Sequence, residues 1–66
     1  NNMIFAVIEA RRKSGKVCEW RVEMKDDLFR LDVKGLEERC LNIINKSTLK
    51  TWDKFISCKF IKRDII

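Results

Sequence analysis

Hydrophobic and polar residues alternate in the first part of the chain with the two-residue period of a β-strand. In residues 4–11 one side of the pattern is apolar throughout, with Ile4, Ala6, Ile8 and Ala10. Residues 17–24 alternate in the same way, and Trp20 and Val22 fall on their apolar side. The pattern therefore predicts two strands, 4–11 and 17–24, that place their apolar sides against one core.

The spacing between these strands predicts a tight antiparallel hairpin. The apolar positions of both strands are even-numbered, so they share a face only if the loop has an odd number of residues. A three-residue loop at 13–15 meets this condition and pairs Ile8 with Trp20 and Ala6 with Val22. It also places Gly15 where a positive φ is needed, a conformation that glycine adopts without steric cost.

Residues 28–33 fit two patterns, and a third strand is the preferred interpretation. A turn at 26–27 would pair Val22 with Leu31 on the apolar face and Glu23 with Arg30 on the other, as in a regular sheet. The alternative is a helix that begins at Asp27, since several apolar residues here also follow helical spacing.

A helix is predicted over residues 36–46, followed by a last strand. Gly35 is the expected N-cap, with Glu37 and Glu38 in the first turn, where the helix dipole favours acids. Its apolar stripe, which should pack on the sheet, consists of Leu36, Cys40, Ile43 and Ile44. Residues 54–62 alternate again and predict a C-terminal strand, with a second helix as the alternative.

These elements predict an α+β fold: a small antiparallel β-meander of three strands, one packed helix and a C-terminal strand. With 66 residues, the chain has room for one domain, 1–66. The meander-then-helix order resembles the layout of basic nucleic-acid modules such as integrase arm-type and plant AP2 domains. The resemblance is one of layout alone, and it implies no site residues.

Charge adds a preference for an anionic partner. Fifteen Lys and Arg against ten acids give a formal net charge of +5, which suits nucleic acid or an acidic protein surface. The apolar run at the N-terminus is too short for a membrane span, so no membrane partner is expected. An intracellular location, cytoplasmic or nuclear, is expected from three widely spaced cysteines that form no CxxC pair.

Catalytic equipment is not evident in the sequence. The chain has no histidine, the commonest general base and zinc ligand, and no glycine-rich phosphate loop. We therefore expect no enzyme activity, no catalytic residues, no metal and no cofactor. A Glu23-x-Lys25 triplet leaves a metal-dependent nuclease as a remote alternative.

Two basic clusters are the candidate nucleic-acid site. The first crowds the hairpin tip without an acid among its members, which are Arg11, Arg12, Lys13 and Lys16. The second is more dispersed and comprises Lys46, Lys50, Lys54, Lys59, Lys62 and Arg63. We expect the hairpin tip to contact phosphates, with support from Lys59, Lys62 and Arg63.

The outward side of the sheet suggests a different function, a protein-interaction or inhibitor module. Its charges alternate in sign and balance one another, while its apolar members exceed what a small monomer should expose: Phe5, Val7, Val17, Phe55 and Ile61. This alternative predicts a protein interface or a homodimer, formed by sheet-face packing or by strand addition.

Overall fold

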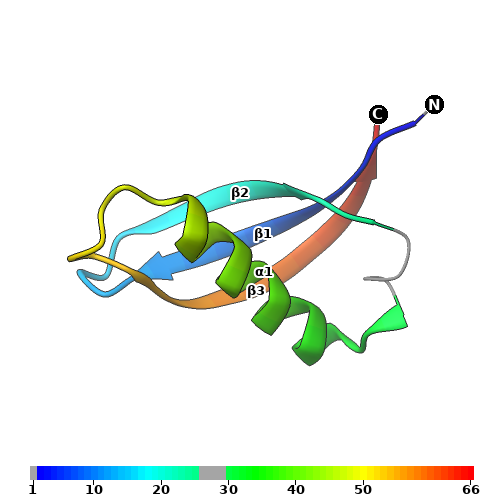
Figure 1. Ribbon diagram of the computed structural model, residues 1–66. Helices are drawn as coiled ribbons and strands as arrows, with labels where there is room; N and C mark the ends of the chain where they lie inside the picture. Colours follow the sequence, from blue (N-terminus) through cyan, green and yellow to red (C-terminus); the bar gives the residue numbers. More distant parts are fainter. Residues whose placement is uncertain (1, 26–29) are drawn as a thin grey trace.

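The computed structural model describes residues 2–25 and 30–66 of the chain. Its elements are β1 (Ile4–Arg12), β2 (Val17–Glu23), α1 (Val33–Ser47) and β3 (Phe55–Ile65). The strands form one antiparallel sheet in the order β2-β1-β3, and α1 lies across one face of it (Figure 1). The predicted α+β fold with a packed helix and a C-terminal strand is confirmed.

The β1–β2 hairpin has the predicted register. Ile8 lies opposite Trp20 and Ala6 opposite Val22, and Gly15 has a φ of 96°. The loop is closed by the Arg12 N–H, which donates to the Lys16 carbonyl at 2.8 Å. The alternation of apolar residues and one glycine were sufficient to specify this hairpin, because its contacts are local.

The predicted strand at 28–33 is wrong over the residues that the structure describes. Residues 30–32 lie in no strand and α1 begins at Val33, whereas residues 26–29 fall outside the described part. The predicted pairs of Val22 with Leu31 and of Glu23 with Arg30 are therefore not formed. The alternative helix from Asp27 begins outside the described part, and over the described residues it is wrong, because residues 31 and 32 are not helical and α1 begins at Val33.

Asp32 explains where the helix begins. Its side chain accepts a hydrogen bond from the Gly35 N–H at 2.7 Å, so Asp32 is the N-cap and the predicted cap at Gly35 is wrong. Gly35 instead lies in the first turn, where an added Cβ would approach Asp32 Oδ1 to 2.9 Å. Glu37 and Glu38 consequently lie beyond the first turn.

β3 pairs with the side of β1 that is opposite β2, so β1 is the central strand of the sheet. Ile8 lies opposite Phe60 and Ala10 opposite Cys58. The order is thus two strands, a helix and a strand, so the meander-then-helix resemblance does not extend to the described chain. Register shifts opposite Val7/Ile8 and Arg11/Arg12 are β-bulges, which change the face to which the following residues point.

The core lies between the sheet and α1. The helix contributes Leu36, Cys40 and Ile44, as its apolar stripe predicted, and Ile43 packs partly against them. The sheet side of the core is formed by Ala6, Ile8, Ala10, Val22 and Phe55, with Met24 just beyond β2. Within the described residues, no helix combines the length and apolar composition that crossing a membrane requires.

Two side chains of α1 hydrogen-bond to the backbone of β3. The Asn45 amide donates to the Phe55 carbonyl at 2.9 Å and accepts from the Phe55 N–H at 2.9 Å. The Glu37 carboxylate accepts from the Phe60 N–H at 2.8 Å. These bonds satisfy backbone groups of an edge strand and fix α1 along β3.

Candidate functional site

Two loops lie side by side at one end of the molecule (Figure 1). Residues 13–16 connect β1 to β2, and residues 48–54 connect α1 to β3. The Lys13 N–H donates to the Lys54 carbonyl at 2.8 Å, and the Ser14 N–H and hydroxyl both donate to the Asp53 carboxylate at 2.8 Å. We call this unit, residues 13–16 and 48–54, the two-loop tip.

Hydrogen bonds from Ser14 favour the ionised form of the Asp53 carboxyl. Hydrogen bonds from the Ser14 hydroxyl and backbone N–H, with smaller help from nearby Arg12 and Lys50, lower the pKa of Asp53 below its ordinary value. The group is therefore ionised at neutral pH, and both of its oxygens accept from Ser14. This acid joins the loops and offsets part of the positive charge that the sequence left uncompensated at the hairpin.

Arg12 has a structural position, contrary to its predicted role as a phosphate contact. It is only 9% exposed, and its guanidinium carbon lies 4.1 Å from the centre of the Phe55 ring. The guanidinium donates to the Asp53 carbonyl at 2.7 Å and contacts the Thr48 hydroxyl at 3.4 Å. The cause is alternation: Arg12 is even-numbered, like Ala10 and Ile8, so it points to the helix side of β1.

The other cations of the two-loop tip are exposed. Lys13 and Lys16 come from the hairpin, as predicted, with Arg11 at the end of β1, and Lys50 and Lys54 come from the α1–β3 loop. Two large apolar side chains of the same loop are also exposed, Trp52 at 76% and Leu49 at 92%. The tip thus combines positive charge with one exposed aromatic ring.

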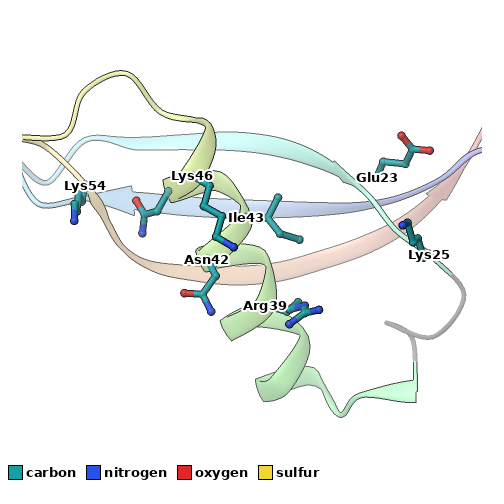
Figure 2. Close-up of a pocket in the computed structure, with 8 residues that line it drawn as sticks. Glu23, Lys25, Arg39, Asn42, Ile43, Lys46 and Lys54 are labelled. Atoms are coloured by element: carbon teal, nitrogen blue, oxygen red, sulfur yellow. The ribbon is translucent and has the colours of Figure 1, made fainter.

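An open groove of about 780 Å³ leads away from this tip along α1 (Figure 2). Figure 2 shows Arg39, Asn42 and Lys46 following one another along the helix, with Lys54 beyond its C-terminal end and Lys25 beyond β2. The described residues that line it are Glu23, Lys25, Arg39, Asn42, Ile43, Asn45, Lys46 and Lys54. Within residues 2–25 and 30–66, the groove therefore has four cations and one carboxylate, and Lys54 connects it to the two-loop tip.

Local helix geometry produces one wall of the groove. Arg39, Asn42, Ile43 and Lys46 are separated by steps of three, one and three residues, a spacing that places them on one face of a helix. The sequence carried this signal, yet Arg39 was not among the predicted site residues. Lys25 was considered only in the Glu23-x-Lys25 triplet and not as a cation of the binding site, because it joins the groove only through the tertiary arrangement of β2 and α1.

The structure does not bring the C-terminal cations together with the hairpin tip. Lys59 lies opposite Glu9, and Lys62 lies opposite Val7, both on the sheet face away from α1. Arg63 lies opposite Ala6, near the end of β3 that is distant from the tip. On the same open face Arg21 forms a salt bridge with Asp64. The open face is thus balanced in charge, as its sequence predicted.

The predicted apolar interface is not a continuous surface. Phe55 is 2% exposed and packs edge-on against Trp20, with ring centres 5.6 Å apart. The bulge at Ile56 reverses the alternation, so Phe55 points into the core and not outward as predicted. Val7 is 4% exposed on the central strand, which also removes it from the surface.

The other three members of the predicted interface remain accessible to different degrees. Phe5 is half-buried, and the guanidinium carbon of Arg21 lies 5.5 Å from its ring centre. Val17 and Ile61 are exposed at opposite edges of the sheet, on β2 and β3. The structure therefore separates the apolar residues that the sequence pattern grouped together.

The cysteines of α1 and β3 are protonated thiols at neutral pH. Burial, with the nearby Glu37 carboxylate, raises the pKa of Cys40. Burial, followed by the proximity of Cys40 and Glu37, raises the pKa of Cys58 to about 11, and the Cys58 thiol donates to the Glu37 carbonyl at 2.9 Å. Over residues 2–25 and 30–66, no three side chains of His, Cys, Asp or Glu gather as metal ligands would.

Comparison of the chain with protein-family models, curated proteins and solved structures found no match. Functional inference therefore depends on the side chains that the fold brings together. These are the cations of the groove and of the two-loop tip, and the exposed Trp52 of the tip.

Proposed function

We propose that this chain is a non-enzymatic nucleic-acid-binding module whose groove and two-loop tip contact the phosphate backbone. The observation that carries the proposal is the composition of the groove, whose lining includes Lys25, Arg39, Lys46 and Lys54 and, among the residues that the structure describes, one carboxylate, Glu23. Cations arranged along a concave surface favour an extended polyanion over a single small anion. Lys54 continues this arrangement into the tip, where Lys13, Lys16 and Lys50 are exposed.

The dimensions of the helix suit this partner. Arg39 and Lys46 are seven residues apart, which corresponds to about 10 Å at the α-helical rise. One strand of B-form DNA rises about 3.4 Å per nucleotide, so the two cations span roughly three nucleotide steps. Asn42 lies between them and offers amide donors to phosphate or sugar oxygens.

A salt titration tests the proposal. We expect the wild-type protein to bind a labelled 20-nucleotide DNA, with affinity that falls steeply as salt increases from 50 to 200 mM. The variant Arg39→Gln/Lys46→Gln should bind roughly 10- to 50-fold more weakly near 0.1 M salt. Its log-log salt slope should be shallower by about 1.4, because each lost phosphate contact on a single strand removes about 0.7 from the slope.

A control variant removes the same charge from another surface. Lys59→Gln/Lys62→Gln also lowers the net charge by two, but on the open sheet face. It should retain most of the wild-type affinity. Equal losses in the two variants would show that net charge alone drives binding and would overturn the groove assignment, and absence of binding by the wild-type protein would overturn the proposed function.

A further inference from the structure

We infer that the preferred ligand is a single-stranded nucleic acid, one unpaired base of which stacks on Trp52. This inference rests on the proposed function and adds the strandedness of the ligand and the position of a base. It begins from the contrast between the two tryptophans. Trp20 packs edge-on against Phe55, whereas Trp52 is 76% exposed on the two-loop tip.

The backbone that carries Trp52 is held in place on both sides. Before it, the Lys50 N–H donates to the Thr48 hydroxyl at 3.2 Å, and the Thr48 N–H donates to the Ile44 carbonyl at 3.0 Å. After it, Asp53 is bound through its carboxylate to Ser14 and through its carbonyl to Arg12. An exposed ring on an ordered loop loses less conformational freedom on binding, which favours a role in recognition.

The charges around Trp52 identify the chemistry of its partner. Lys50 and Lys54 flank it along the chain, and the hairpin that docks on its loop contributes Lys13 and Lys16. An apolar peptide would gain nothing from these four cations. A strand of nucleic acid combines phosphates for the lysines with flat aromatic bases for the indole ring, as in other single-strand binding surfaces.

A duplex offers the same phosphates but not the same base faces. Its bases are already stacked on one another, so contact with the indole would require unstacking, which is energetically unfavourable. An unpaired base has an accessible face and avoids this cost. Duplex binding should therefore depend on the groove and tip cations alone.

Substitution of Trp52 tests the inference with three probes of equal length: a single-stranded DNA, its duplex and an abasic strand that has phosphates but no bases. We expect Trp52→Ala to weaken single-strand binding roughly 5- to 100-fold, and Trp52→Phe to lie between it and wild type. Affinity for the duplex and the abasic strand should remain unchanged. The salt slope should also remain unchanged, because no phosphate contact is lost.

Leu49→Ala is the matched control, since Leu49 is an exposed apolar residue of the same loop without a ring. It should leave single-strand affinity unchanged. A loss equal to that of Trp52→Ala, or equal losses for all three probes, would overturn stacking as the cause. A solution mass that falls from dimer to monomer in Trp52→Ala would assign the ring to contact with a second copy and would also overturn the inference.

Phosphate binding and base stacking are overturned by different results. If the wild-type protein binds none of the probes, the proposed function itself is overturned. If binding is salt-dependent but identical in wild type and Trp52→Ala, phosphate contact stands and only the stacking inference is overturned.

Discussion

The open face of the sheet and the groove with its two-loop tip use positive charge differently. On the open face, Arg21 is paired with Asp64, and Lys59 lies opposite Glu9. In the groove, the described lining has four cations, Lys25, Arg39, Lys46 and Lys54, and one carboxylate. The comparison teaches that the net charge of +5 is less informative than its distribution, because only the second region has a local excess of cations.

Geometry explains the contrast. Residues opposite one another on adjacent strands are about 5 Å apart, so Lys59 of β3 neutralises Glu9 of β1. The long side chain of Arg21 on β2 reaches across β1 to Asp64 of β3. On α1 the residues that share the groove face are basic or neutral, and a helix face has no paired strand to supply acids. The tip is an intermediate case, because Asp53 is used to hold its two loops together.

The largest effect on stability is expected for a buried cation, Arg12. Arg12→Ala removes a guanidinium that stacks on Phe55 and bonds the Asp53 carbonyl, so the free energy of unfolding should fall by about 1–3 kcal/mol. Arg11→Ala, one residue away on the exposed side, should change it by less than about 0.5 kcal/mol. Urea unfolding followed by circular dichroism measures both.

If Arg11→Ala and Arg12→Ala were equally destabilising, the distinction between structural and surface arginines at the tip would be wrong. The binding measurements sharpen the same distinction. Arg11→Ala should reduce the salt slope for DNA binding, whereas any folded fraction of Arg12→Ala should keep the wild-type slope.

A smaller effect is expected for the ion pair of the open face. Arg21 and Asp64 have side chains that are 48% and 34% exposed, so solvent screens their attraction. A double-mutant cycle with Arg21→Ala and Asp64→Ala should give a coupling of about 0.2–1 kcal/mol, decreasing in 0.5 M salt. A coupling of zero at low salt would mean that this face is not neutralised by specific pairs.

The smallest effect concerns the acid of the two-loop tip. The pKa of Asp53 is lower in the folded protein than its ordinary value of 3.8. The ionised Asp53 carboxylate therefore stabilises the folded state at pH values above 3.8. The contribution is lost as the pH falls through the folded pKa. Ser14→Ala should therefore be less stable than wild type at pH 7, and the difference should shrink as the pH falls to 2.

Ser47→Ala is the control for this pH dependence. The Ser47 hydroxyl donates to the Ile43 carbonyl, which does not titrate, so its effect on stability should be the same at both pH values. If Ser14→Ala changed the thermal stability equally at both pH values, Ser14 would not be the cause of the lowered pKa of Asp53.

Sequence by itself determined the local parts of this protein. Alternation and Gly15 specified the hairpin register, and the spacing of Leu36, Cys40 and Ile44 specified the buried face of the helix. These features depend on contacts between near neighbours, which the periods of a strand and a helix encode directly. The same alternation also predicts that Arg12 points to the inner side of the sheet. Arg12 was instead grouped with its basic neighbours as a surface cation.

Tertiary structure decided which distant segments meet. The second neighbour of β1 is β3, and residues 30–33 do not extend the sheet beside β2 as predicted, because Asp32 caps a helix there. A bulge at Ile56 turned Phe55 inward. Docking of the two loops through Asp53 and the approach of α1 to the end of β2 then created the tip and the groove. Such contacts join residues far apart in the sequence, 39 positions for Ser14 and Asp53 and 52 for Ile8 and Phe60. No periodic pattern encodes them, because loop closure and packing select them only in the complete fold.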